Sequence, residues 1–272
     1  MDIAHLLAEK WNKEDLAAGA KPTALGTAYR YSAAHNCSRQ LAYAALNAEQ
    51  TELFDAPSSW VTRLGTMIHE EMQEAIKEVY PDAEFEVASQ VDANLSGSCD
   101  GILTHAGEKV VIEIKTRGQY AWQKETGYGQ WKKTEPKGPS LAAVCQAGLN
   151  AIGLGAEYVC MVSLAKECIS VSKRRKLDID NSYEAFAAEW WIPREEWEPL
   201  AQAEMARVQE IEEGLTVRGY LPAPEIVNDD GQRESVKIGS HWACDYCAFR
   251  STCESDGNGI VPVAISNYKE KQ

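Results

Sequence analysis

The sequence predicts a mixed α/β fold, with a central β-sheet flanked by helices. Two observations predict it. Helical and β-rich apolar segments follow one another in the order helix, three strands, helix, strand, which is typical of a mixed sheet covered by helices. The run from Val110 to Lys115 is also rich in Val and Ile, as expected of a buried central strand. With 272 residues, the chain is long enough for one large domain.

Each element is predicted from its local pattern. Helices are predicted from apolar residues at helical spacing and, for one of them, from Ser140 as a typical N-cap; they cover 3–18, 60–79, 140–154 and 195–214, and an Ala-rich helix begins near Ser38. Strands are predicted over 84–91, 95–103, 109–116 and 158–164. A long loop is predicted over 117–139, and the Pro-containing segment 221–224 begins a C-terminal extension.

An acid and a lysine interrupt the apolar central run, at Glu113 and Lys115. Residues two apart in a strand project from the same face, and buried charges are costly unless they are paired or hold a metal. A hairpin turning through residues 105–108 would bring Asp100 beside Glu113. Two carboxylates and a lysine at one place can bind a hard divalent cation and position a water. The alternative is a structural Glu–Lys pair with an unrelated turn Asp, and the surrounding aliphatic run favours the metal site.

Two helical residues extend this candidate site. His69 lies within the amphipathic helix 60–79, one turn after Gly65, although a lone helical His is more often structural than a ligand. Gln146 is the polar exception on the apolar side of the helix that Ser140 begins, and we expect it to face the two acids.

Charge and aromatic patterning leave DNA binding open. The formal net charge of −14 argues against a nucleic-acid coat protein, and seven glutamates between 195 and 213, Glu204 among them, are predicted to form the solvated face of a helix. DNA contact is therefore predicted only in basic grooves, where aromatic rings stack on bases and lysines neutralise phosphates. The candidate residues are Tyr120, Trp122, Trp131, Lys132, Lys133, Arg174 and Arg175. A partly packed surface loop is the alternative for 117–139.

The eight cysteines fall into two groups. Cys99, Cys145, Cys160 and Cys168 are dispersed in core-like elements and are interpreted as small hydrophobic residues. Cys244, Cys247 and Cys253 are clustered, with two and then five residues between them, and such thiols suit a metal. A fourth ligand is needed, either Cys37 at a helix start or, less favoured, His241. Three clustered cysteines with a distant fourth are more typical of a [4Fe–4S] cluster than of zinc.

These motifs together resemble the PD-(D/E)XK nuclease superfamily. The resemblance lies in Gly65 with His69, Asp100-Gly101, Glu113-Ile114-Lys115 and the helical Gln146, on the helix, three-strand, helix, strand order. The four cysteines make the chain similar to the RecB-like iron–sulfur branch, which includes CRISPR-associated Cas-four exonucleases, their phage relatives and AddB-type nuclease domains. Two positions depart from the pattern: Asn150 stands where relatives often carry Tyr, and Cys99 stands where Pro is usual.

The resemblance implies a restriction-endonuclease-like core whose N- and C-terminal segments are joined by a [4Fe–4S] cluster on Cys37, Cys244, Cys247 and Cys253. It also implies that Mg²⁺ or Mn²⁺ is held by His69, Asp100, Glu113 and the backbone carbonyl of Ile114. Lys115 would orient the attacking water, and Gln146 would position the nucleophile or the DNA backbone. Asp100, Glu113, Lys115 and Gln146 are thus the expected catalytic residues.

The sequence therefore predicts a metal-dependent DNA exonuclease acting on DNA ends or single strands. One nuclease domain is expected, with an N-terminal helical segment (1–58), a catalytic core (59–170) and a cluster-binding extension (171–272). Three alternatives remain: a subunit of a CRISPR-adaptation or recombination complex, a non-catalytic iron–sulfur DNA-binding protein, and a zinc-stapled nuclease. A homo-oligomer is possible. No signal peptide or membrane span is apparent, so a cytoplasmic protein of a bacterium, or of a phage in its host, is expected.

Overall fold

The structure is a computed structural model that describes residues 10, 14, 25, 27–52, 56–129, 135–168, 170–176 and 183–263, except the side chains of 56–58, 171, 173 and 183. Its Cα positions form two compact units. Unit 1 comprises Met1–Leu64, Asp92–Gly97 and Gln202–Gln272, and unit 2 comprises Gly65–Val91 and Ser98–Ala201. The predicted helix over 3–18 lies almost entirely outside the described residues.

Three elements run through both units: α3 (Ala56–Val79), β3 (Leu95–His105) and α7 (Arg194–Thr216). Unit 2 also holds β2 (Glu84–Gln90), β4 (Glu108–Arg117), α4 (Gln119–Thr126), α5 (Leu141–Leu154), β5 (Tyr158–Ala165), α6 (Val171–Lys176), the 3-10 helix η2 (Tyr183–Ala185) and β6 (Ala187–Pro193). Unit 1 also holds β1 (Tyr29–Arg30), the 3-10 helix η1 (Tyr31–Ala33), α2 (Ser38–Ala45), β7 (Tyr220–Leu221), β8 (Glu225–Val227), β9 (Arg233–Ser235), α8 (Trp242–Asp245), α9 (Arg250–Asp256) and β10 (Val261–Pro262).

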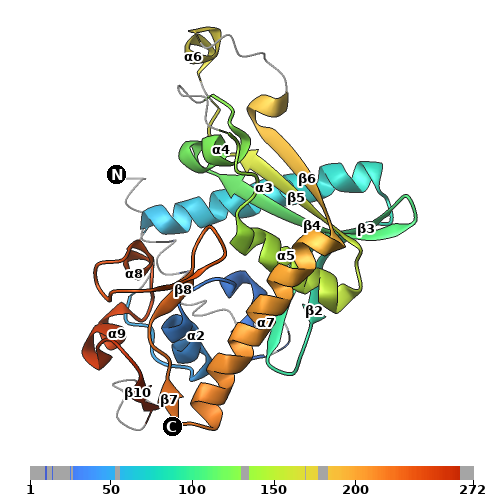
Figure 1. The fold of residues 1–272 in the computed structure, drawn as a ribbon. Helices are drawn as coiled ribbons and strands as arrows, with labels where there is room; N and C mark the ends of the chain where they lie inside the picture. Colours follow the sequence, from blue (N-terminus) through green and yellow to red (C-terminus); the bar gives the residue numbers. More distant parts are fainter. Residues whose placement is uncertain are drawn as a thin grey trace. The chain divides into compact units, whose positions relative to one another are not determined.

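The central sheet is mixed, which confirms the predicted α/β class. β3 and β4 form an antiparallel hairpin, β5 runs parallel to β4, β6 runs antiparallel to β5, and β2 pairs with β3 (Figure 1). β4 is thus an interior strand. Val110, Val111 and Ile114 on it are each at most 1% exposed, as its β-branched composition predicts.

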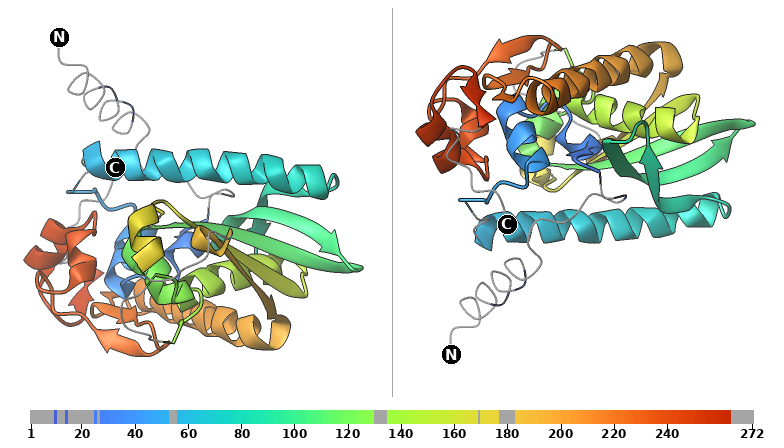
Figure 2. Two further views of the ribbon diagram at one scale, coloured as in Figure 1. Left: turned by 90° about the horizontal axis from the view of Figure 1, so that it is seen from above. Right: turned by 90° about the horizontal axis from the view of Figure 1, so that it is seen from below.

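Helices cover both faces of the sheet in unit 2 (Figure 2). On one face, Ile68, Met72 and Ile76 of α3 pack against the cluster that contains Ile112 and Ile114. On the other face, α5 and Trp197 at the start of α7 pack against the cluster that contains Val111. Glu113 and Lys115 share the strand face of Val111, so the alternation directs these two charges toward α5.

Unit 1 is built from short elements. β1 pairs in parallel with Leu95 and Ser96 of β3. A Cβ atom at Gly97 would lie only 2.4 Å from the ring of the buried Tyr31, so this position requires glycine. β7 pairs with β10, and β8 pairs with β9. These small ribbons and the short helices α8 and α9 correspond to the predicted C-terminal extension.

The predicted elements within the described residues are confirmed with three corrections. The segment 117–139 is not a loop throughout, because β4 continues to Arg117 and α4 follows between Gly118 as its N-cap and Gly127, whose left-handed conformation ends it. The strand β6 was not predicted. Glu204 is not solvated: it is 4% exposed and pairs with Arg207 at 2.6 Å.

The dispersed cysteines also divide differently from the prediction. Cys99, Cys145 and Cys160 are buried as expected, whereas Cys168 is exposed, so the interpretation of Cys168 as a core residue is wrong.

No helix in the described part of the chain is long and apolar enough to cross a membrane.

A buried ion pair fixes α4 on the sheet. The Nε of Arg117 donates to Oε1 of Glu125 at 2.6 Å, and the hydroxyl of Ser163 on β5 donates to Oε2 of Glu125 at 3.0 Å. Glu125 is 6% exposed, and Trp122 beside it on α4 is 1% exposed. Contacts from β4 and β5 therefore hold α4, which directly follows the strand that carries Glu113 and Lys115.

We expect Glu125→Gln to destabilise the protein by about 3 kcal/mol, because it leaves the charge of Arg117 largely buried without its counter-ion. The matched control is Glu157→Gln. Glu157 pairs with Arg194 at 3.3 Å, and both side chains are more than 40% exposed, so this change should cost less than about 1 kcal/mol. Urea unfolding of the two full-length variants checks the difference. Equal losses would mean that the Arg117–Glu125 pair does not anchor α4.

Candidate active site and cysteine-lined pocket

The β3–β4 hairpin places Asp100 against the centre of β4. The antiparallel pairing ends at Gly101 and Ile112, and Asp100 precedes Gly101. Beyond that point a side chain replaces the backbone as the hydrogen-bond acceptor for β4: the N–H of Ile114 donates to Oδ2 of Asp100 at 2.6 Å. The predicted hairpin is confirmed, with its turn at Ala106 and Gly107. The role of the Ile114 carbonyl as a ligand stays a prediction.

His69 on α3 faces the same carboxylate. Its Nδ1 lies 3.5 Å from Oδ1 of Asp100. The hydrogen bond with Asp100 raises the pKa of His69, while burial works in the opposite direction. Gln73, one turn further along α3, donates to the backbone carbonyl of Asp100 at 3.3 Å. A Cβ atom at Gly65 would meet the Thr116 hydroxyl at 3.5 Å, an ordinary contact.

Glu113 is the most buried acid of the group, at 1% exposed. Its Oε1 accepts a hydrogen bond from Nζ of Lys115 at 2.6 Å, whereas its Oε2 is buried without a hydrogen-bond partner. Burial raises the pKa of Glu113 to about 7, since a charged carboxylate is poorly solvated there. Lys115 opposes this shift, and the neighbouring charge of Asp100 adds to it.

Gln146 on α5 completes the group. Its Oε1 accepts a second hydrogen bond from Nζ of Lys115, at 3.0 Å. The structure therefore brings together His69, Asp100, Glu113, Lys115 and Gln146, all within unit 2. One turn after Gln146 lies Asn150, which is fully buried. Its side chain accepts from the Ser89 hydroxyl and donates to the carbonyl of Ser98, so this position ties α5 to β2 and β3.

The donor set fits a hard divalent cation in its chemistry. Among the described residues, no three His, Cys, Asp or Glu side chains are already arranged as a metal-binding group. Instead, one carboxylate oxygen of Asp100 accepts a hydrogen bond from the N–H of Ile114, and one of Glu113 accepts a hydrogen bond from Lys115. The unpartnered Oε2 of Glu113 nevertheless leaves a buried carboxylate oxygen without the partner that such atoms normally have. A cation there would satisfy it and would favour the charged form of Glu113.

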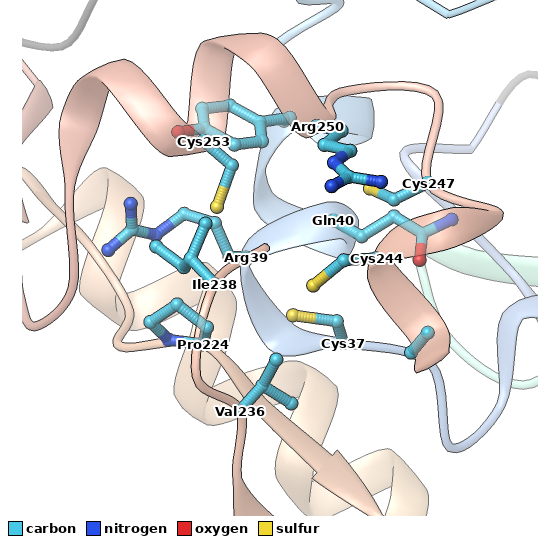
Figure 3. Close-up of a pocket in the computed structure, with 12 residues that line it drawn as sticks. Cys37, Arg39, Gln40, Pro224, Val236, Ile238, Cys244, Cys247, Arg250 and Cys253 are labelled. Carbon is cyan, nitrogen blue, oxygen red and sulfur yellow. The ribbon is translucent and has the colours of Figure 1, made fainter. Parts of the chain in front are cut away.

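Four cysteines line one pocket in unit 1 (Figure 3). Cys37 is the N-cap of α2, Cys244 lies on α8, Cys247 follows that helix and Cys253 lies on α9. The sulfur atoms of Cys37, Cys244 and Cys253 are directed toward the space between the residues (Figure 3). The other candidate ligand, His241, uses its Nδ1 to accept the N–H of Ala243 and so caps α8.

The surroundings of this pocket raise the pKa of two of its thiols. Burial raises the pKa of Cys247 to about 11 and that of Cys253 to about 12, and the nearby thiols add to both shifts. Thiols crowded in this way resist ionisation by themselves, and a bound metal cation reverses that preference. Four cysteines that line one pocket suit either structural zinc or an iron–sulfur cluster.

The predicted DNA contacts have mixed outcomes. Tyr120 on α4 is 81% exposed, but Trp122 is buried, so the expectation that Trp122 stacks on bases is wrong. Arg175 on α6 is exposed and Arg174 is partly buried. Trp131, Lys132 and Lys133 lie outside the described residues. The Arg117–Glu125 pair beside the site was not predicted, and its only signal is that Arg117 follows Glu113 and Lys115 at the strand period of two.

No protein-family model matches the chain, and no curated protein matches its sequence. Among solved structures, the chain is similar to SSO0001, at 19% identity and a TM-score of 0.49, over 93% of this chain and 96% of the other. It is also similar to the alkaline exonuclease LHK-Exo from Laribacter hongkongensis, at 15% identity and a TM-score of 0.41, over 75% and 94%. For LHK-Exo in complex with dAMP, the sequence identity is 14% and the TM-score is 0.44, over 66% of this chain and 80% of the other. At such identities and TM-scores, function is inferred from the residues of this chain.

The raised pKa of Glu113 predicts how the metal-free protein responds to pH. Between the ordinary value of 4.5 and about 7, the folded chain keeps the proton that the unfolded chain releases. Wild-type stability therefore falls as the pH rises through this window, by about 3 kcal/mol. Glu113→Gln keeps an oxygen acceptor for Lys115 and does not titrate, so we expect its stability relative to wild type to rise by that amount between pH 5 and pH 8.

Urea unfolding in the presence of a chelator measures this difference. Glu108→Gln is the matched control, because Glu108 is an exposed glutamate at the start of the same strand. A Glu113→Gln variant that follows the pH profile of the control would contradict the burial cost assigned to Glu113.

Proposed function

We propose that the protein is a divalent-metal-dependent DNA exonuclease of the PD-(D/E)XK type, hydrolysing phosphodiester bonds at DNA ends or in single strands. The observation that carries this proposal is the convergence of His69, Asp100, Glu113 and Lys115, with one buried oxygen of Glu113 unpartnered. A wholly structural Glu–Lys pair gives no reason for a second acid and an imidazole to lie beside it.

In this proposal, His69, Asp100 and Glu113 hold Mg²⁺ or Mn²⁺. An imidazole with two carboxylates accepts both ions and often favours the softer Mn²⁺. When bound, the cation supplies charge neutralisation at the phosphate and lowers the pKa of a water. The protein residues supply the geometry around it. The N–H of Ile114 holds one oxygen of Asp100, which leaves the other facing His69.

Lys115 is the residue that orients the attacking water. An ammonium group has three N–H donors, and in the described part of the chain two of them are used by Glu113 and Gln146. The third can donate to a water or to a phosphate oxygen as negative charge develops there. Gln146 fixes the direction of that third donor, because it holds the ammonium from α5 while Glu113 holds it from β4.

The four-cysteine pocket fits a structural role beside this chemistry. We propose that Cys37, Cys244, Cys247 and Cys253 hold a [4Fe–4S] cluster, as in the RecB-like and Cas-four-like nucleases that the sequence resembles. Such a cluster would tie α2 to the C-terminal helices α8 and α9, all within unit 1. The exposed Tyr120 beside the catalytic strand is the residue we propose for stacking on a DNA base.

The first test uses linear DNA labelled at one end, freshly purified protein and Mn²⁺. We expect progressive loss of DNA from one end, and we expect Glu113→Ala and Lys115→Ala to abolish it, because they remove a ligand and the water-orienting donor. Glu108→Ala on the exposed start of the same strand is the matched control and should digest normally. Absorbance in the visible region reports the cluster in every variant.

Undiminished cleavage by Glu113→Ala or Lys115→Ala would refute the site. If wild-type protein with an intact cluster digests no DNA, the exonuclease proposal fails for the isolated chain, and a partner-dependent subunit or a DNA-binding scaffold replaces it. Removal of the divalent ion by a chelator should stop digestion, and Mn²⁺ should restore it.

Gln146→Leu tests the positioning of Lys115 separately. We expect kcat to fall about 10- to 100-fold with little change in KM, since a misdirected Lys115 mainly affects the reacting geometry. Gln209→Leu, on the exposed side of α7, is the control. Steady-state digestion of a fluorescent single-stranded oligonucleotide provides both constants, and an unchanged kcat would show that Gln146 has no part in the reaction.

A further inference from the structure

Arg39 is a fully buried cation beside the cysteine-lined pocket. It lies in the first turn of α2, and none of its surface is exposed. Each of the three guanidinium nitrogens donates to a backbone carbonyl: Nε to Pro222 at 2.6 Å, Nη1 to Gly257 at 3.5 Å and Nη2 to Gly259. These carbonyls satisfy its hydrogen bonds but bring no negative charge.

In the described part of the chain, the charge of Arg39 has no direct carboxylate partner. Among the described residues, no ion pair within 4.0 Å includes it. The hydroxyl of Tyr43, which also interacts with Arg39, donates a hydrogen bond to Asp256, so this carboxylate is linked to Arg39 only through Tyr43. A buried cation without a counter-ion normally costs several kcal/mol, even with water penetration and relaxation. The fold therefore leaves a place for an anion near Arg39.

A second arginine on the same pocket shows the contrast. Arg250 also lines the pocket (Figure 3). It donates to Asp245 at 3.0 Å and to Glu254 at 2.9 Å, and its side chain is 35% exposed. Its charge is thus compensated twice and solvated. Of the two pocket arginines, only Arg39 carries a buried charge that these carboxylates do not neutralise.

We propose that Arg39 is the counter-charge of an anionic, thiolate-ligated metal centre in this pocket. The inference rests on the cluster included in the proposed function. Four thiolates outweigh the positive charge of either zinc or an iron–sulfur core, so the loaded centre is an anion. Arg39 and the four cysteines line the same pocket, where Arg39 is fully buried and the cysteines are partly buried. Each charge therefore offsets the burial cost of the other.

This role is separate from the mechanical one. Through its three carbonyl contacts, Arg39 also fastens α2 to the segments at 222 and 257–259. A clasp depends on the shape of the guanidinium, whereas a counter-charge depends only on the positive charge. Lysine keeps the charge but cannot reproduce the three-way contact, and glutamine loses the charge.

The test compares full-length wild type, Arg39→Lys, Arg39→Gln and the matched control Arg250→Gln, all purified without oxygen. The first readout is the rate at which a coloured chelator extracts the pocket metal, which works for iron and for zinc. We expect Arg39→Gln to release metal about tenfold faster or more, and Arg39→Lys and Arg250→Gln to stay within about threefold of wild type. Where the metal is iron, we also expect Arg39→Gln to move the reduction potential to more negative values, because reduction adds negative charge.

Three results would overturn the proposal. Equal rates of metal release from Arg39→Lys and Arg39→Gln would indicate that Arg39 acts only through the shape of its contacts. The other two are a rate for Arg250→Gln that matches the rate for Arg39→Gln, and the absence of metal from the wild-type pocket after anaerobic reconstitution. If Arg39→Gln does not fold, Arg39→Lys decides, since release tenfold faster than wild type contradicts a role for charge. A chain that follows the expected pattern but digests no DNA refutes the nuclease and leaves this inference intact.

Discussion

The burial of Glu113 in the interior strand β4 is the constraint on which the candidate site depends. β4 has neighbouring strands on both edges and helices on both faces, so the side chains at its centre are buried in the core of unit 2. A carboxylate there must be neutralised by a proton, a lysine or a metal. Lys115 fulfils this requirement for one oxygen only, and the raised pKa shows that the compensation is incomplete. The environment thus maintains a carboxylate that gains from a further cation.

The surrounding residues can be understood from this incomplete compensation. Gln146 holds Lys115 from the side opposite Glu113. The N–H of Ile114 donates to one oxygen of Asp100. His69 approaches Asp100 from α3, and Gln146 approaches Lys115 from α5, so both layers that cover the sheet contribute a side chain to the group. Lys115 and Asp100 are each held by two contacts, and such restraint is what a precise arrangement of functional groups requires.

Local sequence was sufficient for the strand that carries the site and for the hairpin that completes it. The period of two set Glu113 and Lys115 on one face, and the turn at Ala106-Gly107 set Asp100 against β4. α4 was not foreseen, because its stability comes from the tertiary pair of Arg117 with Glu125 and from the burial of Trp122. A pattern of aromatic and basic residues looks the same whether the ring faces DNA or the core.

The same limit applies to unit 1. The spacing of Cys244, Cys247 and Cys253 indicated a metal site, and an isolated Cys37 could only be a candidate until the fold placed all four on one pocket. Glu204 looked like one more acid on a solvated helix, since Arg207 three residues later gives no sign in the sequence that both are buried. Sequence periodicity reports which face of an element is apolar, and it does not report which charges are enclosed when elements pack.

Among the described residues, the buried pair of Glu204 and Arg207 differs from the buried charges of Glu113 and Arg39. Glu204 and Arg207 satisfy each other through two hydrogen bonds, and their remaining contacts go to the backbone at His35 and Asn36. Such a closed pair needs nothing more, and a structural role accounts for it. Glu113 retains an unpartnered oxygen, and Arg39 has hydrogen bonds but no direct ion pair among the described residues. A folded chain would not be expected to keep such imbalances at no benefit, because apolar replacements of similar size are often more stable. The two imbalances have opposite sign, and each lies where the sequence predicts a centre of the compensating sign: a cation at Glu113 and an anionic thiolate centre at Arg39.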